Sequence, residues 1–167
     1  MAITYNATGS GNGVGTGDVT VTVNATAGDL IIAFVGWGDA TATATISGTV
    51  DGAFTSIIGP IHNTTESIQV FVKLSSTGGS QDITDGGIPG GVGRSLAVVS
   101  YTGSGNATGA TASATATTGT ALDSGSVTTL TDASMVVGMG FSRASSVISV
   151  GNDGQGNTLV SRQANSS

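Results

Sequence analysis

Alternation of apolar and polar residues with a period of two is the feature that most constrains how this chain can fold. In residues 18–24, valines at every second position alternate with threonines, which is typical of a strand with one buried face. Residues 30–35 are apolar at every position and predict a central strand that is covered on both faces. The turn residues Ala27, Gly28 and Asp29 separate the two segments. These patterns favour β-structure over helix.

Further segments of strand length follow, and clusters of Gly, Asn, Asp and Ser separate them. No stretch combines a sustained 3.6-residue period with helix-capping signals. We expect strands at residues 42–50, 54–58, 68–74, 96–101, 127–130, 135–141, 147–150 and 158–161. Many short strands with frequent turns predict an all-β fold, namely an antiparallel β-sandwich of jelly-roll-like type.

A chain of 167 residues is long enough for one β-domain with a substantial core. We expect a flexible N-terminal arm at residues 1–17, because its second half is rich in glycine. The sandwich then occupies residues 18–162, and residues 163–167 form a polar C-terminal tail. The first residues lack the basic and apolar regions of a secretory signal, so no signal peptide is expected in this chain.

Composition narrows the classes of partner. The chain has four Lys or Arg residues against ten acidic ones, a net charge of −6, and no cysteine. Its few cations are scattered, whereas nucleic-acid binding needs them clustered, so we expect no nucleic-acid partner. No apolar run approaches the roughly 20 residues needed to span a bilayer, so membrane insertion is not expected either. The absence of cysteine excludes disulfides and thiolate metal sites.

The residues that catalysis would need are sparse. His62 is the only imidazole, its setting resembles a loop or a strand edge, and the chain has no Gly-x-Ser-x-Gly nucleophile motif. Nearly all aspartates lie beside small residues at expected turns, where Asp accepts backbone hydrogen bonds. Aromatic residues, which form the platforms of sugar-cleaving clefts, make up only 4% of the chain. We therefore predict that the protein is not an enzyme and requires no cofactor.

Calcium is the metal that this composition could accommodate, because it is bound through oxygen atoms alone. The best candidate is the loop that contains Asn152, Asp153 and Asn157, and residues 82–85, with Asp82 and Asp85, come second. Neither has the spacing of an EF-hand. Ordinary turn formation is the alternative explanation for both loops.

Four residues are candidates for contact with a partner. Trp37 lies at the end of the central strand and could stack on a sugar or anchor an interface, with core capping as the alternative. Phe71 shares its strand face with polar neighbours, which predicts contact with a neighbouring subunit. Ile3 and Tyr5, in the N-terminal arm, could complete an open sheet edge in a neighbour.

Asn-x-Ser/Thr triplets are also frequent, and in a secreted protein they would accept N-linked glycans. The abundance of Ser and Thr produces such triplets by chance as well. The triplets begin at Asn6, Asn24, Asn63, Asn106 and Asn165.

Three stretches together carry a resemblance. Residues 27–37, the Gly59-Pro60 pair before residues 68–74, and residues 94–103 resemble the Gly/Thr-rich jelly-roll modules of bacteriophage virion proteins and related bacterial surface proteins. The resemblance covers roughly residues 18–162. Its motifs are packing and turn patterns, so it implies a fold and a structural role but transfers no functional residue.

The function that follows is a non-enzymatic, self-associating virion accessory subunit, either a capsid decoration or a tail-associated protein. Its expected partners are copies of itself and another structural protein, and its expected location is the virion or the extracellular space. One alternative is a subunit of an extracellular filament or surface layer. Another is a carbohydrate-binding module that recognises a surface glycan.

Overall fold

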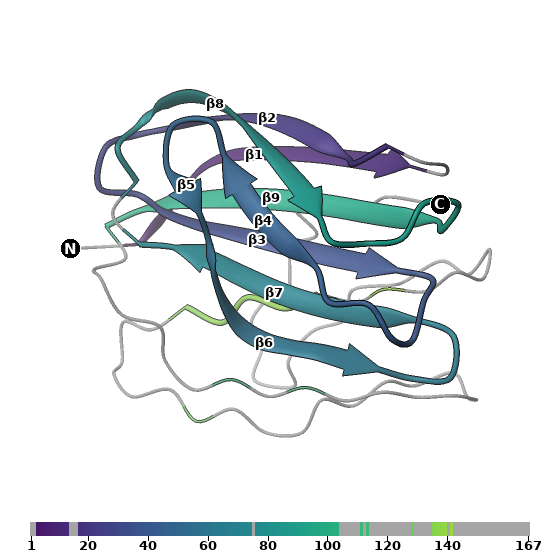
Figure 1. Cartoon of the computed structure of the whole chain (residues 1–167). Helices are drawn as coiled ribbons and strands as arrows, with labels where there is room; N and C mark the ends of the chain where they lie inside the picture. Colours follow the sequence, from purple (N-terminus) through teal and green to yellow (C-terminus); the bar gives the residue numbers. More distant parts are fainter. Residues whose placement is uncertain are drawn as a thin grey trace.

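The computed structural model describes residues 3–13, 17–74, 76–103, 111, 113, 128, 135–139 and 141. Over these residues the protein is all-β, with two antiparallel sheets that pack face to face (Figure 1). The predicted antiparallel sandwich is confirmed, and its jelly-roll connectivity stays a prediction. None of the described segments forms a helix that could cross a membrane.

The two sheets have five and four strands. The larger sheet has, in spatial order, β1 (Thr4–Gly13), β9 (Arg94–Thr102), β3 (Leu30–Trp37), β7 (Ser67–Lys73) and β6 (Thr55–His62). The smaller sheet has β2 (Thr20–Ala25), β8 (Gly79–Gly86), β4 (Thr45–Gly48) and β5 (Gly52–Ala53).

The main core lies between the sheets, where the alternating residues of β2 face the inner row of β3. Val19, Val21 and Val23 contribute from one side, and Ile31 and Val35 from the other. All eight residues of β3 are buried, which confirms the prediction of a central strand covered on both faces. The burial follows from position, because β3 lies between β9 and β7 and the smaller sheet covers its inner face.

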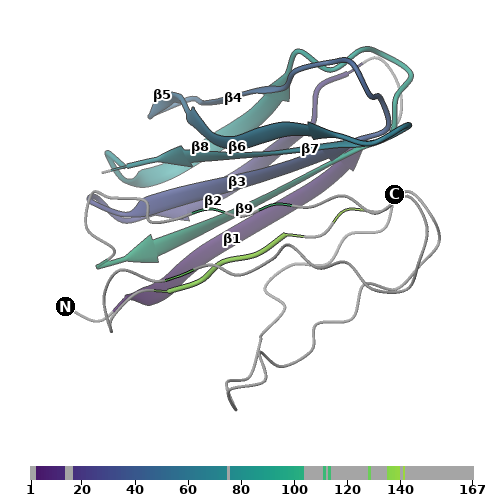
Figure 2. The same cartoon turned by 90° about the horizontal axis from the view of Figure 1, so that it is seen from below.

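The outer face of the larger sheet carries a second apolar cluster, which includes the other residues of β3. Val137 and Met139 pack against it, and the ring of Phe141 covers Gly36 so closely that a Cβ there would lie 2.3 Å from it. Figure 2 shows this segment, in light green, running along the larger sheet. The structure assigns no strand to residues 135–139 or to residue 141, so the strand predicted there is not observed. Apart from residue 128, the strands predicted at 127–130, 147–150 and 158–161 lie outside the described residues, as does the tail at 163–167.

The flexible arm predicted at residues 1–17 is, over Thr4–Gly13, the edge strand β1 instead. It pairs with β9 along its whole length, with one bulge at Asn6. Ile3 packs against the outer cluster and the ring of Tyr5 meets that of Tyr101 edge-on, so both residues lie against their own chain. They were predicted to complete a neighbour's sheet.

Small residues at every second position explain why β1 has no apolar alternation. Its inner row consists of Ala7, Gly9, Gly11 and Gly13. A Cβ on Gly9 would lie 2.7 Å from the carbonyl oxygen of Thr22 in β2. Glycine therefore allows the two strands to approach closely, which is a common role of glycine within strands.

We expect Gly11→Val to lower the free energy of unfolding by about 1–3 kcal/mol, because overpacking displaces neighbouring groups. A Cβ at this position would lie 2.8 Å from Cγ1 of Val19 and 3.1 Å from Cγ1 of Val21. Urea denaturation measures the change. Ser10→Val, at the adjacent position on the other face of β1, is the matched control and should have a much smaller effect. Equal losses in the two variants would contradict the close packing of β1 on β2.

Candidate functional site

Three aspartates are buried, two of them in turns beside strands and the third within β8. Asp29, Asp51 and Asp85 are 0%, 8% and 1% exposed, respectively. Each carboxylate accepts hydrogen bonds from parts of the chain that are distant in sequence, and we call the resulting clusters clasps. The Arg94 clasp consists of Arg94, Asp85 and Asp18. The Asp51 clasp consists of Asp51, Ser76, Thr77 and Gln81. The Asp29 clasp consists of Asp29, Asn6, Thr26 and Thr102.

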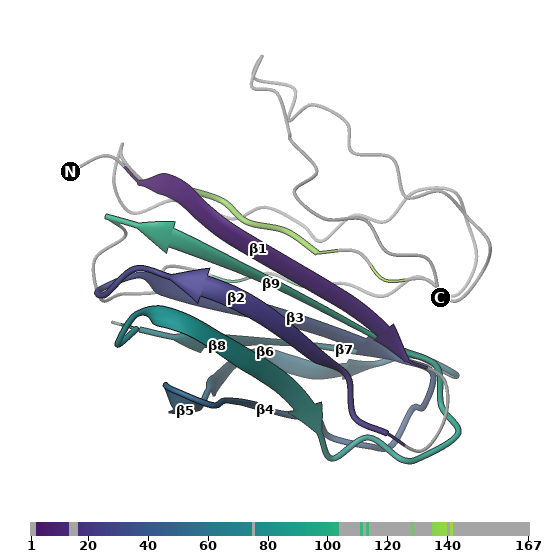
Figure 3. The same ribbon diagram turned by 90° about the horizontal axis from the view of Figure 1, so that it is seen from above.

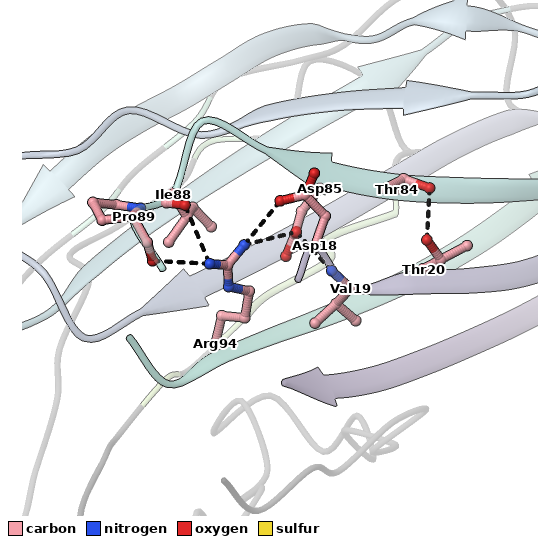
Figure 4. Close-up of polar contacts among 8 residues, drawn as sticks. All are labelled: Asp18, Val19, Thr20, Thr84, Asp85, Ile88, Pro89 and Arg94. Carbon is pink, nitrogen blue, oxygen red and sulfur yellow. Dashed lines mark hydrogen bonds and ion pairs between the residues drawn. The ribbon is translucent and has the colours of Figure 1, made fainter. Parts of the chain in front are cut away.

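The Arg94 clasp joins the two sheets (Figure 4). Arg94 is the first residue of β9, and its side chain is 1% exposed. Its Nη1 lies 3.2 Å from Oδ1 of Asp18, which precedes β2, and 3.3 Å from Oδ1 of Asp85 in β8. The same Asp85 oxygen accepts a hydrogen bond from the amide of Val19 at 2.9 Å. One guanidinium group thus connects the larger sheet with two strands of the smaller one.

The other end of the guanidinium group secures the loop between β8 and β9. Nη2 of Arg94 donates to the carbonyl oxygens of Ile88 and Pro89, at 3.2 and 2.9 Å. Burial raises the pKa of Asp85, against the opposing effects of the Val19 amide and the Arg94 charge. The Val19 amide and Arg94 thus act together in favour of the ionised form of Asp85.

The Asp51 clasp connects the turn between β4 and β5 with β8 and the loop before it. Oδ2 of Asp51 accepts hydrogen bonds from Oγ of Ser76 at 2.7 Å and from Nε2 of Gln81 at 2.5 Å. Oδ1 accepts a bond from the amide of Thr77 at 2.7 Å. Burial opposes ionisation of Asp51, but these hydrogen bonds outweigh it and hold its pKa below the ordinary value.

The Asp29 clasp anchors β1 and the end of β9 to the turn before β3. Oδ2 of Asp29 accepts bonds from Nδ2 of Asn6 at 2.5 Å and from the amide of Thr26 at 2.9 Å. Oδ1 accepts a bond from the hydroxyl of Thr102 at 2.7 Å. Burial opposes ionisation here too, and the hydrogen bonds again leave the pKa lowered. The bulge at Asn6 is the local feature that interrupts the register of β1 beside this carboxylate.

The pKa shifts predict a loss of stability in acid. For Asp29 and Asp51 the folded-state pKa lies below 3.8, the unfolded value, so their contribution is present above that pH and is lost as the pH falls through the folded pKa. Asp85 has the opposite sign and offsets part of the loss, because its pKa is raised. We expect the free energy of unfolding, measured with urea, to fall below about pH 4. The fall should be less steep in Asp51→Asn, and equal slopes in the two proteins would contradict the role of Asp51.

His62, the only imidazole, lies at the end of β6 beside Ser67. Its Nδ1 is 2.5 Å from Oγ of Ser67, whose hydroxyl donates to the carbonyl oxygen of Asp39. A hydroxyl has one hydrogen, so Nδ1 must be the donor to Ser67. Ser67 is also 1% exposed, and the His62 ring stands edge-on to Trp37 with centroids 6.5 Å apart. This arrangement orients the imidazole ring but does not activate Ser67 as a nucleophile.

Trp37 and Phe71 are core residues rather than surface contacts. They are 0% and 4% exposed and belong to the cluster between the sheets, so neither is available to a glycan or a neighbouring subunit. The prediction for Phe71 was wrong because its polar neighbour Gln69 is buried as well. Gln69 donates to Oγ of Ser56 and accepts a hydrogen bond from the amide of Ala44. The row that looked exposed in the sequence is therefore the row that faces the core.

The second calcium candidate, residues 82–85, is part of strand β8. Asp82 is exposed and Asp85 is buried, because residues three apart in a strand face opposite sides. The two carboxylates do not converge, so this candidate was wrong. In the described ranges, no three His, Asp or Glu side chains are grouped so that they could hold a metal ion. The first candidate, Asn152, Asp153 and Asn157, lies outside the described residues and stays a prediction.

The candidate glycosylation sites differ in their surroundings. Nδ2 of Asn6 already donates to Asp29 and Thr26, and a glycan would replace one of its two hydrogens. Oδ1 of Asn63 accepts two backbone amides within a turn. Asn24 is exposed on β2, and Asn106 and Asn165 lie outside the described residues. Glycosylation at these positions stays a prediction.

An open depression of about 290 Å³ lies along β6 and β7. Its lining is mainly apolar and includes Ile57, Val72 and Leu74. The ammonium group of Lys73 is its one charged group and lies 3.4 Å from the carbonyl oxygen of Ala53. The depression thus offers no convergent set of polar groups for a ligand.

Comparison with protein-family models, curated proteins and solved structures found no match. The case for a function therefore depends on the geometry of this chain. The clasps are the part of that geometry that sequence reasoning missed, since it assigned their aspartates to turns and treated Arg94 as one of several scattered cations. Their only sequence signal is a lone arginine at the start of an otherwise uncharged strand.

Proposed function

We propose that this protein is a non-enzymatic structural subunit of a multi-copy assembly, namely a virion accessory protein that decorates a capsid or associates with a tail. The observation that carries the proposal is the set of three clasps. Each uses a buried carboxylate to join strands or loops that are far apart in the sequence, and one of them joins the two sheets. Each of these hydrogen bonds and ion pairs restrains the relative positions of the strands and loops that it joins.

The outer face of the smaller sheet supports the same proposal. Small polar side chains lie across it and bond to one another, with Thr20 and Thr84 joined at 2.8 Å and Thr22 donating to Asp82 at 2.6 Å. Among the described residues, Lys73 and the buried Arg94 are the only cations. Side chains of this size leave room for the close approach of another chain, and Asp82 supplies an acceptor for a partner's donor. The partners that fit are copies of this chain and another structural protein, in a virion or an extracellular setting.

Negative-stain microscopy of the purified full chain at neutral pH tests this proposal. We expect regular multi-copy particles or binding to capsid or tail structures. Filaments or sheets made of this chain alone would overturn the virion role in favour of the filament or surface-layer alternative. Single copies that bind a glycan array would overturn it in favour of a carbohydrate-binding module. Trp37 is buried, so the sugar would have to bind through other residues.

An activity assay tests the non-enzymatic part of the proposal. Turnover of any substrate that is lost in His62→Ala, while urea denaturation shows that the variant is still folded, would contradict it. Asn24→Ala, an exposed change on β2, is a suitable control for handling and purity. We expect both variants to match the parent protein in having no turnover.

A further inference from the structure

β1 itself contributes little apolar surface to the hydrophobic clusters of the sandwich. Neither hydrophobic cluster takes a fully buried member from Thr4–Gly13, and only Ala7 packs against the inter-sheet core. Figure 3 shows β1 at the edge of the larger sheet, with β9 beside it and β2 across from it. Segments that bury little apolar surface open locally while the rest of a protein stays folded.

The position of β1 beside β9 and against β2, here called the slot, is in contrast costly in free energy to leave empty. Without β1, the edge of β9 loses its backbone partner along the register from Arg94 to Thr102. Asp29, which is 0% exposed, loses the bond that Asn6 donates at 2.5 Å. A buried carboxylate that loses a donor is strongly destabilised. The slot thus favours occupation by some strand at all times.

The slot also selects its occupant. A Cβ at Gly9, Gly11 or Gly13 would lie within 2.7–2.8 Å of atoms of Thr22 or Val19, so only a strand with very small residues at these places fits. The occupant must also carry a donor that reaches Asp29 at the bulge. The N-terminal segment of this chain meets both requirements.

We propose that β1 is exchanged between copies, so that β1 of one subunit fills the slot of a second copy of this chain. This inference rests on the proposed self-association and specifies how it occurs. An exchanged strand makes the same contacts as the strand of the chain itself, so raising the concentration of copies favours exchange by mass action. Exchange would link subunits without any additional interface.

Single-cysteine variants test the exchange, since the chain has no cysteine of its own. Asn12 in β1 pairs with Ser95 in β9, and Oγ of Ser95 donates to Oδ1 of Asn12 at 2.9 Å. Asn12→Cys and Ser95→Cys are purified separately, mixed at the concentration used for assembly and oxidised mildly. A disulfide between the two variants then requires β1 of one copy to lie on β9 of the other. Ser95→Cys mixed with Thr22→Cys, an exposed position on β2, measures random collision.

We expect the Asn12→Cys and Ser95→Cys mixture to give at least roughly tenfold more heterodimer than the control, because exchanged strands hold the thiols at a high effective concentration. A non-reducing gel and intact mass measure the yield. The double variant must form its disulfide within one chain or between exchanged chains, which shows that this cysteine pair can react. Control-level heterodimer with an intrachain link in the double variant would overturn the exchange. If microscopy still shows particles in that case, the exchange fails but the proposed function stands, and if it shows single copies, both fail.

Discussion

Replacing Arg94 with methionine is expected to lower the free energy of unfolding by about 3–5 kcal/mol, the usual cost of removing one partner from a buried ion pair. Methionine is an unbranched side chain of similar length, so it fills much of the same space. The carboxylate of Asp85, whose side chain is 0% exposed, is left without its cation. It also removes the bonds to the loop after β8. Urea denaturation at neutral pH measures the loss.

Two further variants make this prediction specific. In the double variant Arg94→Met with Asp85→Asn, the buried charge is absent, and the amide oxygen can still accept the bond from Val19. It should recover a large part of the loss. Lys73→Met removes the half-buried cation at the end of β7 and should cost less than about 1 kcal/mol. A double variant as unstable as Arg94→Met alone would show that the arginine acts through its packing and its bonds to the loop rather than through the charge of Asp85.

Trp37→Ala is expected to cost about 3–5 kcal/mol, because it opens a cavity in the core between the sheets. The side chain is 0% exposed, and its ring is the edge-on partner of His62. Val50→Ala is a suitable control because Val50 is 45% exposed, and it should change stability by less than about 0.5 kcal/mol. If Trp37→Ala kept full stability and lost binding to a glycan, the tryptophan would be a binding residue and its placement in the core would be wrong.

Strands with strong alternation could be predicted from the sequence, and strands built from small residues could not. The Val/Thr alternation of β2 and the apolar run of β3 indicate which faces of these strands are buried, without knowledge of the strands that pair with them. In β1 and β8 the glycines and aspartates resemble turns. Pairing stabilises both segments as strands, with β9 beside β1 and with β2 and β4 on either side of β8. Tertiary context therefore overrides the local preference of these two segments.

The candidate site depended still more on tertiary pairing. Asp29 and Asp51 could be assigned to turns, because Asp is favoured there, whereas Asp85 lies in strand β8. Which donors reach each carboxylate depends on strand register, which local pattern does not encode. Gln69 shows the same limit, because a polar side chain in a strand is read as exposed unless its partners across the core are known.

Hydrogen exchange of individual amides is the most direct test of whether the buried aspartates act as internal cross-links. The amides of Val19, Thr26 and Thr77 donate to Asp85, Asp29 and Asp51, and none of the three residues lies within a strand. The amide of Thr41 donates to Asp39 at 2.8 Å in an exposed setting and is the matched control. A hydrogen bond to a buried charge stabilises by about 1.5–3 kcal/mol, so we expect the three clasp amides to exchange roughly ten to a hundred times more slowly than that of Thr41. Exchange at the rate of Thr41 in all three would contradict the account.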